Sequence, residues 1–408
     1  MKKNIYHRLY YLNKIRGFYK HDIIKVITGI RRCGKSCFML SVIEDLMKMR
    51  IPDKDIIYLN LDKRGYKNIK TSEHLEKTIY EYINDDSQKF IFIDEVQNVN
   101  GFEEIINALR EEGHSIFITG SNSYLLSGEL ATKLTGRYIE VEMFPLNFYE
   151  YMGMKKFLGN DVDKNIMNEF KSYIRDGGFP NSLEFASAED RDLYARNVID
   201  QIFAKDIAQR YKIRDRNIFN RIRDFCINNF GSITSVGSIV DYFYKNGVNV
   251  KRETVQRYIG ILEAAKILYK CPRFDLKSKK SLRGEGKYYL ADLSIYFCTN
   301  NDKRINYGPV LENIVFCYLK SKGHDLSVGR IGKLECDFIS RKRDEYFYIQ
   351  VAMTIMNEST EEREYRPFEL IRDNYPKYLF TLDTFEQKRD GIRHVNVADF
   401  IADNRDLS

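Results

Sequence analysis

The sequence predicts an α/β protein in which a core built on a parallel sheet precedes a helical segment and a second α/β domain. Short apolar strands alternate with amphipathic helices over the first 145 residues, a pattern typical of parallel sheets. The pattern then turns mostly helical up to about residue 230, and a second alternation runs from near residue 307 almost to the C-terminus. At about 150 residues per domain, a chain of 408 residues is expected to form more than one unit.

The elements of the core follow one another at short intervals. A strand over 23–28 is followed by a glycine-containing loop and a helix up to about residue 49. Four more apolar runs predict strands, at 55–61, 89–94, 115–119 and 138–141. Helices are expected at 72–84 and 102–112. We therefore place the core at 1–145, a helical lid or linker at 146–230, a basic segment at 231–303 and the second α/β domain at 304–408.

Composition excludes several classes of protein. Hydrophobic residues make up 43% and charged residues 30% of the chain, which excludes a mainly disordered or fibrous protein. No apolar stretch approaches the ~18 residues of a membrane helix, and basic residues interrupt the start. The seven cysteines are scattered without a C-x-x-C pair, so neither a disulfide framework nor a zinc site is indicated. A cytoplasmic protein without membrane contact is expected.

A glycine-rich loop follows the first strand and matches G-x-x-x-x-G-K-[ST]. Backbone N–H groups at the start of the next helix bind phosphate oxygens, the lysine reaches the β and γ phosphates, and the serine hydroxyl can ligate magnesium. The motif therefore predicts an ATP site with Mg²⁺ as its metal. The candidate nucleotide-binding residues are Gly29, Ile30, Arg31, Arg32, Cys33, Gly34, Lys35, Ser36 and Cys37.

A second motif supports the first, because the apolar strand at 89–94 ends in two adjacent carboxylates. Next to a phosphate loop, Asp94 is expected to hold magnesium together with Ser36. Glu95 is expected to polarise the attacking water. An acidic pair at a strand end is by itself most often only solvent-exposed, and the phosphate loop favours the catalytic interpretation.

Two further candidates follow later strands. Ser121 and Asn122 come after the strand at 115–119 and could sense the γ phosphate or position water, although they also suit an ordinary turn. Arg137 could stabilise charge at the active site of a neighbouring subunit. A structural salt bridge is an equal alternative for this arginine.

These motifs together resemble those of the AAA+ superfamily of ATPases. The second half resembles a prokaryotic group of these ATPases that carries a C-terminal domain of unknown function. The resemblance implies a P-loop ATPase core, a winged helix, a nuclease-like C-terminal domain and ring-shaped homo-oligomers such as hexamers. It is carried by 29–36, 90–95, 119–122, Gly136-Arg137, Met143-Phe144-Pro145-Leu146, Gly177-Gly178-Phe179-Pro180 and the run Lys287-Tyr288-Tyr289-Leu290-Ala291-Asp292.

The net charge of +7 resides in one stretch of the chain. Residues 231–290 hold 12 Lys or Arg against 5 Asp or Glu. Helices expected at 235–244 and 251–265 have helix-turn-helix spacing, and strands at 269–276 and 287–290 could form a wing around a basic loop. Binding of DNA is one interpretation, and packing between domains or subunits is the other. The DNA-binding candidates are Lys251, Arg252, Gln256, Arg257, Lys277, Lys279, Lys280 and Arg283.

The last segment resembles the PD-(D/E)XK nuclease fold in the spacing of Glu312, Asp337 and Gln350. Such nucleases hold a divalent cation with an acidic pair and activate water with a lysine two positions after the second acid. Here those positions are Gln350 and Ala352, which predicts a degenerate site in a binding or assembly domain. Glu335 would belong to the remaining acidic cluster. The missing groups could be replaced by Glu361, Glu362 or Lys333.

The sequence thus predicts a magnesium-dependent ATPase coupled to DNA. Two rivals stay open. The first is a nucleotide-gated interaction protein whose basic face contacts protein, and the second is an active defence nuclease.

Overall fold

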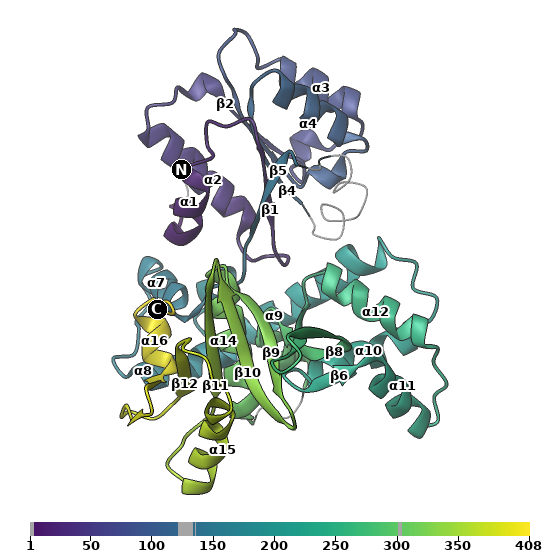
Figure 1. Ribbon diagram of the computed structural model, residues 1–408. Helices are drawn as coiled ribbons and strands as arrows, with labels where there is room; N and C mark the ends of the chain where they lie inside the picture. The colour runs from purple at the N-terminus through teal and green to yellow at the C-terminus, as the bar shows by residue number, and fades with distance from the viewer. Residues whose placement is uncertain (1–3, 121–133, 135, 301–303) are drawn as a thin grey trace. The chain divides into compact units, whose positions relative to one another are not determined.

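The computed structural model describes residues 4–120, 134, 136–300 and 304–408 (Figure 1). The chain forms two compact units, Met1–Met143 and Phe144–Ser408. Across the described ranges, no helix has both the length and the apolar character needed to span a membrane.

The first unit is built on a parallel sheet of five strands in the order β2-β3-β4-β1-β5. Every residue of β1, β3 and β4 is buried, as expected for strands covered on both faces. The α/β class and the parallel sheet predicted from the sequence are confirmed. The strands are β1 (Ile24–Thr28), β2 (Ile56–Asn60), β3 (Phe90–Asp94), β4 (Ser115–Thr119) and β5 (Tyr138–Glu142).

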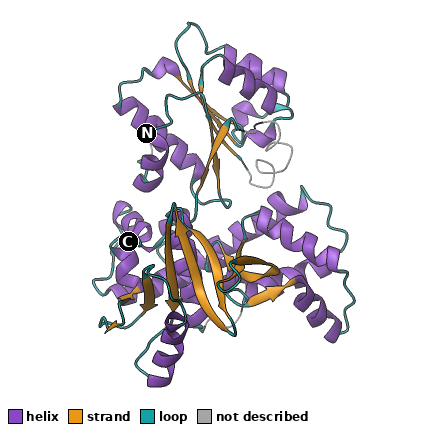
Figure 2. Ribbon diagram, viewed as in Figure 1, coloured by secondary structure: helices purple, strands orange, loops and turns teal. Residues whose placement is uncertain are grey.

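Among the described residues of this unit, four α-helices accompany the sheet. Helices α1 and α2 lie on one side of it and α3 and α4 on the other (Figures 1 and 2). Helix α1 has no counterpart among the elements expected from the sequence. The Thr71 side chain accepts a hydrogen bond from the His74 N–H and so caps α3. The helices are α1 (Leu9–Arg16), α2 (Lys35–Lys48), α3 (Ser72–Tyr80) and α4 (Phe102–Glu111).

The second unit contains a mixed sheet in the order β13-β14-β12-β11-β10-β9-β7-β8-β6. The hairpin β7–β8 is antiparallel, and β7 also pairs in parallel with β9. The expected wing strands therefore share one sheet with the strands of the C-terminal segment. The strands are β6 (Ile233–Ser235), β7 (Leu268–Asp275), β8 (Lys280–Leu290), β9 (Asp325–Ile331), β10 (Leu334–Lys342), β11 (Glu345–Val351), β12 (Lys377–Thr381), β13 (Lys388–Arg389) and β14 (Ile392–Asn396).

The loop of this hairpin is shorter than the sequence suggested. The second wing strand was expected to begin at residue 287, but β8 already begins at Lys280. The ladder extends this far because Arg273, Phe274 and Asp275 pair with Leu282, Ser281 and Lys280. Phe274 and Leu276 also pack against the apolar core of the C-terminal strands, which stabilises the outer part of the hairpin.

The helices that follow the first unit pack within the second one. Helices α7 and α8 pack against the C-terminal α16, α9 packs against α13, and α10 packs against α12. Residues 146–230, expected as a lid or linker, thus contribute to the second unit. The helices are α7 (Phe148–Phe157), α8 (Ile166–Asp176), α9 (Ala188–Gln201) with a π-helical continuation (Ile202–Ala208), α10 (Arg216–Asn228), α11 (Val236–Lys245), α12 (Arg252–Ala264), α13 (Ser294–Thr299), α14 (Tyr307–Ser321), α15 (Glu358–Glu369) and α16 (Val397–Ala402).

A close backbone contact explains the Gly177-Gly178 turn. The Gly178 N–H donates a 2.6 Å hydrogen bond to buried Asp292, and its carbonyl accepts the Leu146 N–H at 2.7 Å. A side chain at Gly178 would place its Cβ 2.2 Å from the Leu146 carbonyl oxygen. Glycine is therefore required where these three segments meet.

Candidate nucleotide and acidic sites

The phosphate loop joins the end of β1 to the start of α2. Gly29 and Gly34 adopt φ angles of 138° and 103°, in the region that favours glycine. A side chain at Gly29 would place its Cβ 2.2 Å from the Met143 carbonyl oxygen and 2.8 Å from Cys33 Sγ. The loop can therefore adopt this conformation only with glycine at position 29.

Lys35 lies over this loop and is 8% exposed. Its Nζ donates to the carbonyl oxygens of Gly29 at 2.9 Å and Ile30 at 3.3 Å. The first turn of α2, which begins at Lys35, has no side-chain cap. An ammonium group next to uncapped helix N–H groups forms a setting that attracts anions.

The rest of the predicted loop lies where the motif requires. Cys33 is buried, and burial raises the pKa of its thiol. Ser36 lies half-buried in the first turn of α2, while Arg31 is half-buried and Arg32 and Cys37 are exposed. Buried Arg8 donates to the Cys33 carbonyl oxygen at 3.4 Å. Sequence analysis missed this support, since a residue 25 positions away carries no local signal.

Asp94, at the end of β3, is fully buried and accepts three hydrogen bonds from neutral groups. The Thr119 hydroxyl donates to Oδ1, while Asn60 Nδ2 and the Tyr58 hydroxyl donate to Oδ2 at 2.8 and 3.1 Å. Such donors stabilise the ionised carboxylate. Burial, and then the charge of Asp94, raises the pKa of Tyr58.

The three donors to Asp94 were not among the predicted site residues. They lie on β2 and at the end of β4, the strands that flank β3 in the sheet. Polar residues at the carboxyl ends of neighbouring parallel strands were the signal that could have identified them.

Glu95 follows Asp94 in a left-handed conformation, with φ of 60° and ψ of 48°. Such backbone costs a non-glycine residue roughly 1–2 kcal/mol. Its N–H donates to Thr119 Oγ1 at 3.0 Å, so one hydroxyl contacts both acidic residues. The Glu95 carboxylate is half-buried and accepts a hydrogen bond from Gln97 Nε2 at 2.5 Å.

Two of the remaining predicted residues, Ser121 and Asn122, lie outside the described part of the chain. Arg137 is exposed, and one guanidinium nitrogen donates to Asn107 Oδ1 at 3.4 Å. Arg137 precedes β5, which pairs in parallel with β1, so the arginine lies at the amino ends of these strands. The phosphate loop begins at the opposite ends, about 13 Å along a five-residue strand. Within one chain, Arg137 and the phosphate loop therefore lie at opposite ends of the strands of this sheet.

The donor chemistry of this site fits magnesium. Ser36 supplies a hydroxyl and Asp94 a carboxylate, and magnesium in nucleotide sites uses few protein oxygens alongside water and phosphates. The described residues contain no cluster of three or more His, Cys, Asp or Glu side chains suited to a metal ion. A dedicated protein cage for a metal is therefore not present among them.

The second unit holds another group of acids, centred on the ammonium of Lys287. Lys287 Nζ lies 2.9 Å from Glu312, 2.9 Å from Glu335 and 3.3 Å from Asp337. Lys287 is 4% exposed. Burial opposes its charge, but Asp337, Glu312 and Glu335 together raise its pKa. Burial, followed by the Asp337 charge, raises the pKa of Glu312 to about 7.

Gln350 lies in the same cluster and connects it to α15. Its Oε1 accepts the Asp337 N–H at 2.8 Å, and its Nε2 donates to Glu364 at 2.9 Å. The structure thus joins Gln350 to Asp337 directly and Asp337 to Glu312 through Lys287. The cluster contains other groups than the ones considered from the sequence as replacements for the missing nuclease residues. The cation is Lys287 rather than Lys333, and the additional acid is Glu364, whereas Glu361 pairs with Arg389 at 3.1 Å.

The predicted DNA-contacting residues form two groups. Lys251, Arg252, Gln256 and Arg257 are exposed at and near the start of α12, and Arg257 donates to the Lys212 carbonyl oxygen at 2.8 Å. Lys277, Lys279 and Lys280 are exposed at the tip of the β7–β8 hairpin. The side chain of Arg283 is outside the described structure. Exposed Lys212, Arg214 and Arg216 add charge beside the first group and were not predicted.

Comparison with known proteins agrees with the geometry of the first unit. A model of an AAA domain matches residues 21–152, and a domain of unknown function (DUF8612) matches residues 167–304. An uncharacterized protein of Haemophilus influenzae is 36% identical over 98% of this chain and 100% of its own length. An uncharacterized protein of Methanocaldococcus jannaschii is 30% identical over 85% of this chain and 78% of its length.

One solved structure supports the fold. A Walker-type ATPase of Pyrococcus abyssi superposes with a TM-score of 0.50 and 14% identity, covering 72% of this chain and 95% of that protein. At this level of identity the match shows a shared fold and nothing about partners.

Proposed function

This chain belongs to the same family as the uncharacterized Haemophilus influenzae protein and carries an AAA domain, and from that premise we propose that it is a magnesium-dependent ATPase. The observation that carries the proposal is the arrangement of Asp94, Glu95 and Thr119 at the ends of β3 and β4, beside a complete phosphate loop after β1. The reaction would convert ATP and water to ADP and phosphate.

Each residue of the site has a defined role in this proposal. The N–H groups of the loop and Lys35 would bind the β and γ phosphates, with the Lys35 ammonium exchanging loop carbonyls for phosphate oxygens. Ser36 and Asp94 would hold magnesium, which supplies charge neutralisation at the phosphates when bound. Glu95 would accept a proton from the attacking water, and Thr119 would fix its backbone.

Two substitutions test the assignment. We expect Lys35→Ala to abolish ATP binding in equilibrium dialysis, because it removes the ammonium that faces the loop. Glu95→Gln should retain binding and lose steady-state hydrolysis. Glu104→Gln, at an exposed carboxylate of α4, is the matched control and should keep both. Turnover by Glu95→Gln would reject Glu95 as the base, and ATP binding by Lys35→Ala would reject the loop assignment.

We further propose that ATP turnover is coupled to DNA binding. The exposed cations at the start of α12 support this, because such side chains suit a phosphate backbone. If about six phosphates are contacted, the logarithm of affinity should fall with the logarithm of salt at a slope of about −5. ATPase assays with duplex, single-stranded and four-way DNA at two salt concentrations provide the test. Hydrolysis that ignores every DNA would favour the nucleotide-gated protein-interaction alternative.

The acidic cluster of the second unit argues against the nuclease alternative. The Lys287 ammonium contacts three of its carboxylates, in the position where a nuclease of the expected type would need a divalent cation. Magnesium-dependent cleavage of plasmid DNA would restore this alternative.

Assembly into a homo-oligomeric ring is also proposed. Its support is the location of Arg137, which is exposed and too far along the sheet to serve its own phosphate loop. A catalytic role for this arginine therefore requires a second subunit. Sedimentation with and without ATP, on the parent and on Arg137→Ala, is the corresponding measurement.

A further inference from the structure

Three segments that are distant in sequence meet at the tip of the β7–β8 hairpin. The Leu276 N–H donates to the Arg330 carbonyl oxygen at 2.9 Å. A Cβ at Gly332, in the β9–β10 turn, would lie 3.4 Å from Lys277 Nζ. Lys277 and Arg372 line one surface hollow together with Leu276, Ile331, Leu370, Ile371 and Asp373. The hairpin, the β9–β10 turn and the segment after α15 thus form one surface.

This hairpin-tip surface is basic, and its cations are Lys277, Lys279, Lys280, Lys333 and Arg372, all of them exposed. Its acids are engaged by neutral donors. Asp275 accepts the Ser278 N–H at 2.7 Å, and Asp373 accepts the Tyr348 hydroxyl at 2.5 Å. Among the residues that the structure describes, neither Lys333 nor Arg372 forms an ion pair. Five cations thus face two carboxylates, so the surface keeps a net positive charge.

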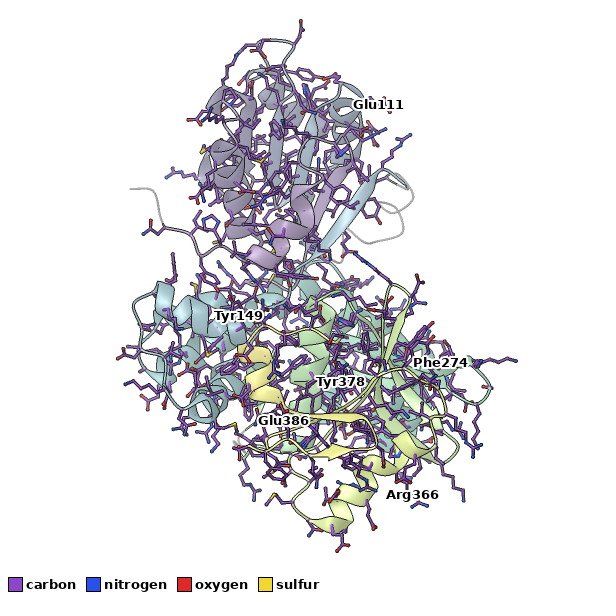
Figure 3. The ribbon with its side chains drawn as sticks, turned by 60° about the vertical axis from the view of Figure 1, so that its left-hand side comes forward. Glu111, Tyr149, Phe274, Arg366, Tyr378 and Glu386 are labelled. Atoms are coloured by element: carbon purple, nitrogen blue, oxygen red, sulfur yellow. The ribbon has the colours of Figure 1, made fainter. Side chains whose placement is uncertain are left out.

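The hairpin tip is also anchored. Phe274, labelled in Figure 3, and Leu276 pack against the apolar cluster that contains Ile331, Phe368 and Ile371. Cations on an anchored hairpin lose less conformational freedom on binding than cations on a mobile loop.

We infer that the hairpin-tip surface is a docking surface for the phosphate backbone of duplex DNA. This rests on the proposed coupling to DNA and extends it to Lys333 and Arg372, which lie outside the basic segment 231–303. Several cations around a hollow suit phosphate contacts, which position a duplex without reading its sequence. Among the described residues, those that line the hollow include no aromatic side chain, so the hollow lacks the stacking platform that unpaired bases use.

The test compares three double variants of the full chain, each lacking two exposed cations. Lys333→Gln/Arg372→Gln changes the hairpin-tip surface, Lys251→Gln/Arg252→Gln changes α12, and Lys156→Gln/Lys171→Gln changes α7 and α8 as a matched control. Fluorescence anisotropy measures binding to a labelled duplex and to one of its single strands over a salt series. Circular dichroism verifies that each variant is folded.

For the first variant we expect about tenfold weaker duplex binding and a salt slope shallower by about 2, because two phosphate contacts are lost. The control should bind like the parent. Unchanged binding by Lys333→Gln/Arg372→Gln, with loss only in the α12 variant, would overturn this inference and leave DNA coupling intact. An equal loss in the control, or tighter binding of the single strand, would also overturn it. A parent chain that binds no duplex would reject both proposals.

Discussion

The two units surround their acidic side chains in different ways. In the first unit, Asp94 accepts hydrogen bonds from a threonine, an asparagine and a tyrosine, none of which carries a charge. In the second unit, Glu312 and Asp337 face the ammonium of Lys287. The first arrangement contains no cation among the donors to its carboxylate, whereas the second supplies its own cation in Lys287. A cluster of acidic residues therefore does not by itself define a metal site.

The largest loss of stability that would test this difference between the units is expected from Lys287→Met. Removing the ammonium leaves the half-buried carboxylates of Glu312 and Asp337 without their cation, while Glu335 keeps Arg273 at 3.5 Å. Loss of one partner from a buried ion pair costs about 3–5 kcal/mol. Chemical unfolding followed by circular dichroism would measure this loss. Lys280→Met, at an exposed lysine of the same strand, should change stability by less than about 0.5 kcal/mol. Equal stability of parent and Lys287→Met would show that these acids are neutralised by other means.

The next largest effect is on the pH dependence of stability, and it comes from a buried lysine without a carboxylate contact. Lys25 donates to the His21 carbonyl oxygen at 2.5 Å and to Ser115 Oγ at 2.8 Å, and burial lowers its pKa from 10.5 to about 7. Between these two pH values the unfolded chain binds a proton that the folded chain does not. This lysine therefore makes the free energy of unfolding rise with pH, by about 3 kcal/mol between pH 7 and 9.5.

Comparison with Lys25→Met isolates this contribution, because other groups titrate equally in both proteins. Unfolding curves at pH 7 and 9.5 should show a smaller rise for the variant than for the parent. Identical pH dependence would mean that Lys25 stays protonated in the folded state, as is expected of Lys287.

The smallest of the three effects on stability is expected from Thr119→Val. The substitution preserves shape but leaves the Glu95 N–H without its acceptor and Asp94 without one donor, which costs about 1–3 kcal/mol. Hydrolysis should fall by about 10–100-fold, since Glu95 loses its positioning group. Affinity for ATP should change little, and Thr119→Ser should restore the rate. A valine variant with full kcat would remove Thr119 from the site.

The parts of the molecule that were predictable from sequence depend on local patterns. The phosphate loop and the Asp94-Glu95 pair each occupy one continuous stretch, so residue type and strand context sufficed. The first sheet followed from short apolar runs of four to seven residues between amphipathic helices. The spacing of Glu312, Asp337 and Gln350 also predicted a cluster, because each lies on a recognisable helix or strand.

What escaped prediction depends on contacts between distant residues. Arg8 reaches Cys33 across 25 positions, and Lys287 reaches Asp337 across 50. The pairing of β7 with β9 is likewise invisible locally, since the hairpin alone has the pattern of an independent wing. Side-chain partners chosen by tertiary packing have no periodicity in the sequence.

The packing of α16 against α7 and α8 has a consequence for biosynthesis. Helices α7 and α8, within residues 148–176, can pack against α16 only after residues 397–402 have been synthesised. The first unit, in contrast, has all of its strands once residue 142 has left the ribosome. During translation the first unit can therefore fold early, while the second unit stays incomplete until residues 397–402 have been synthesised.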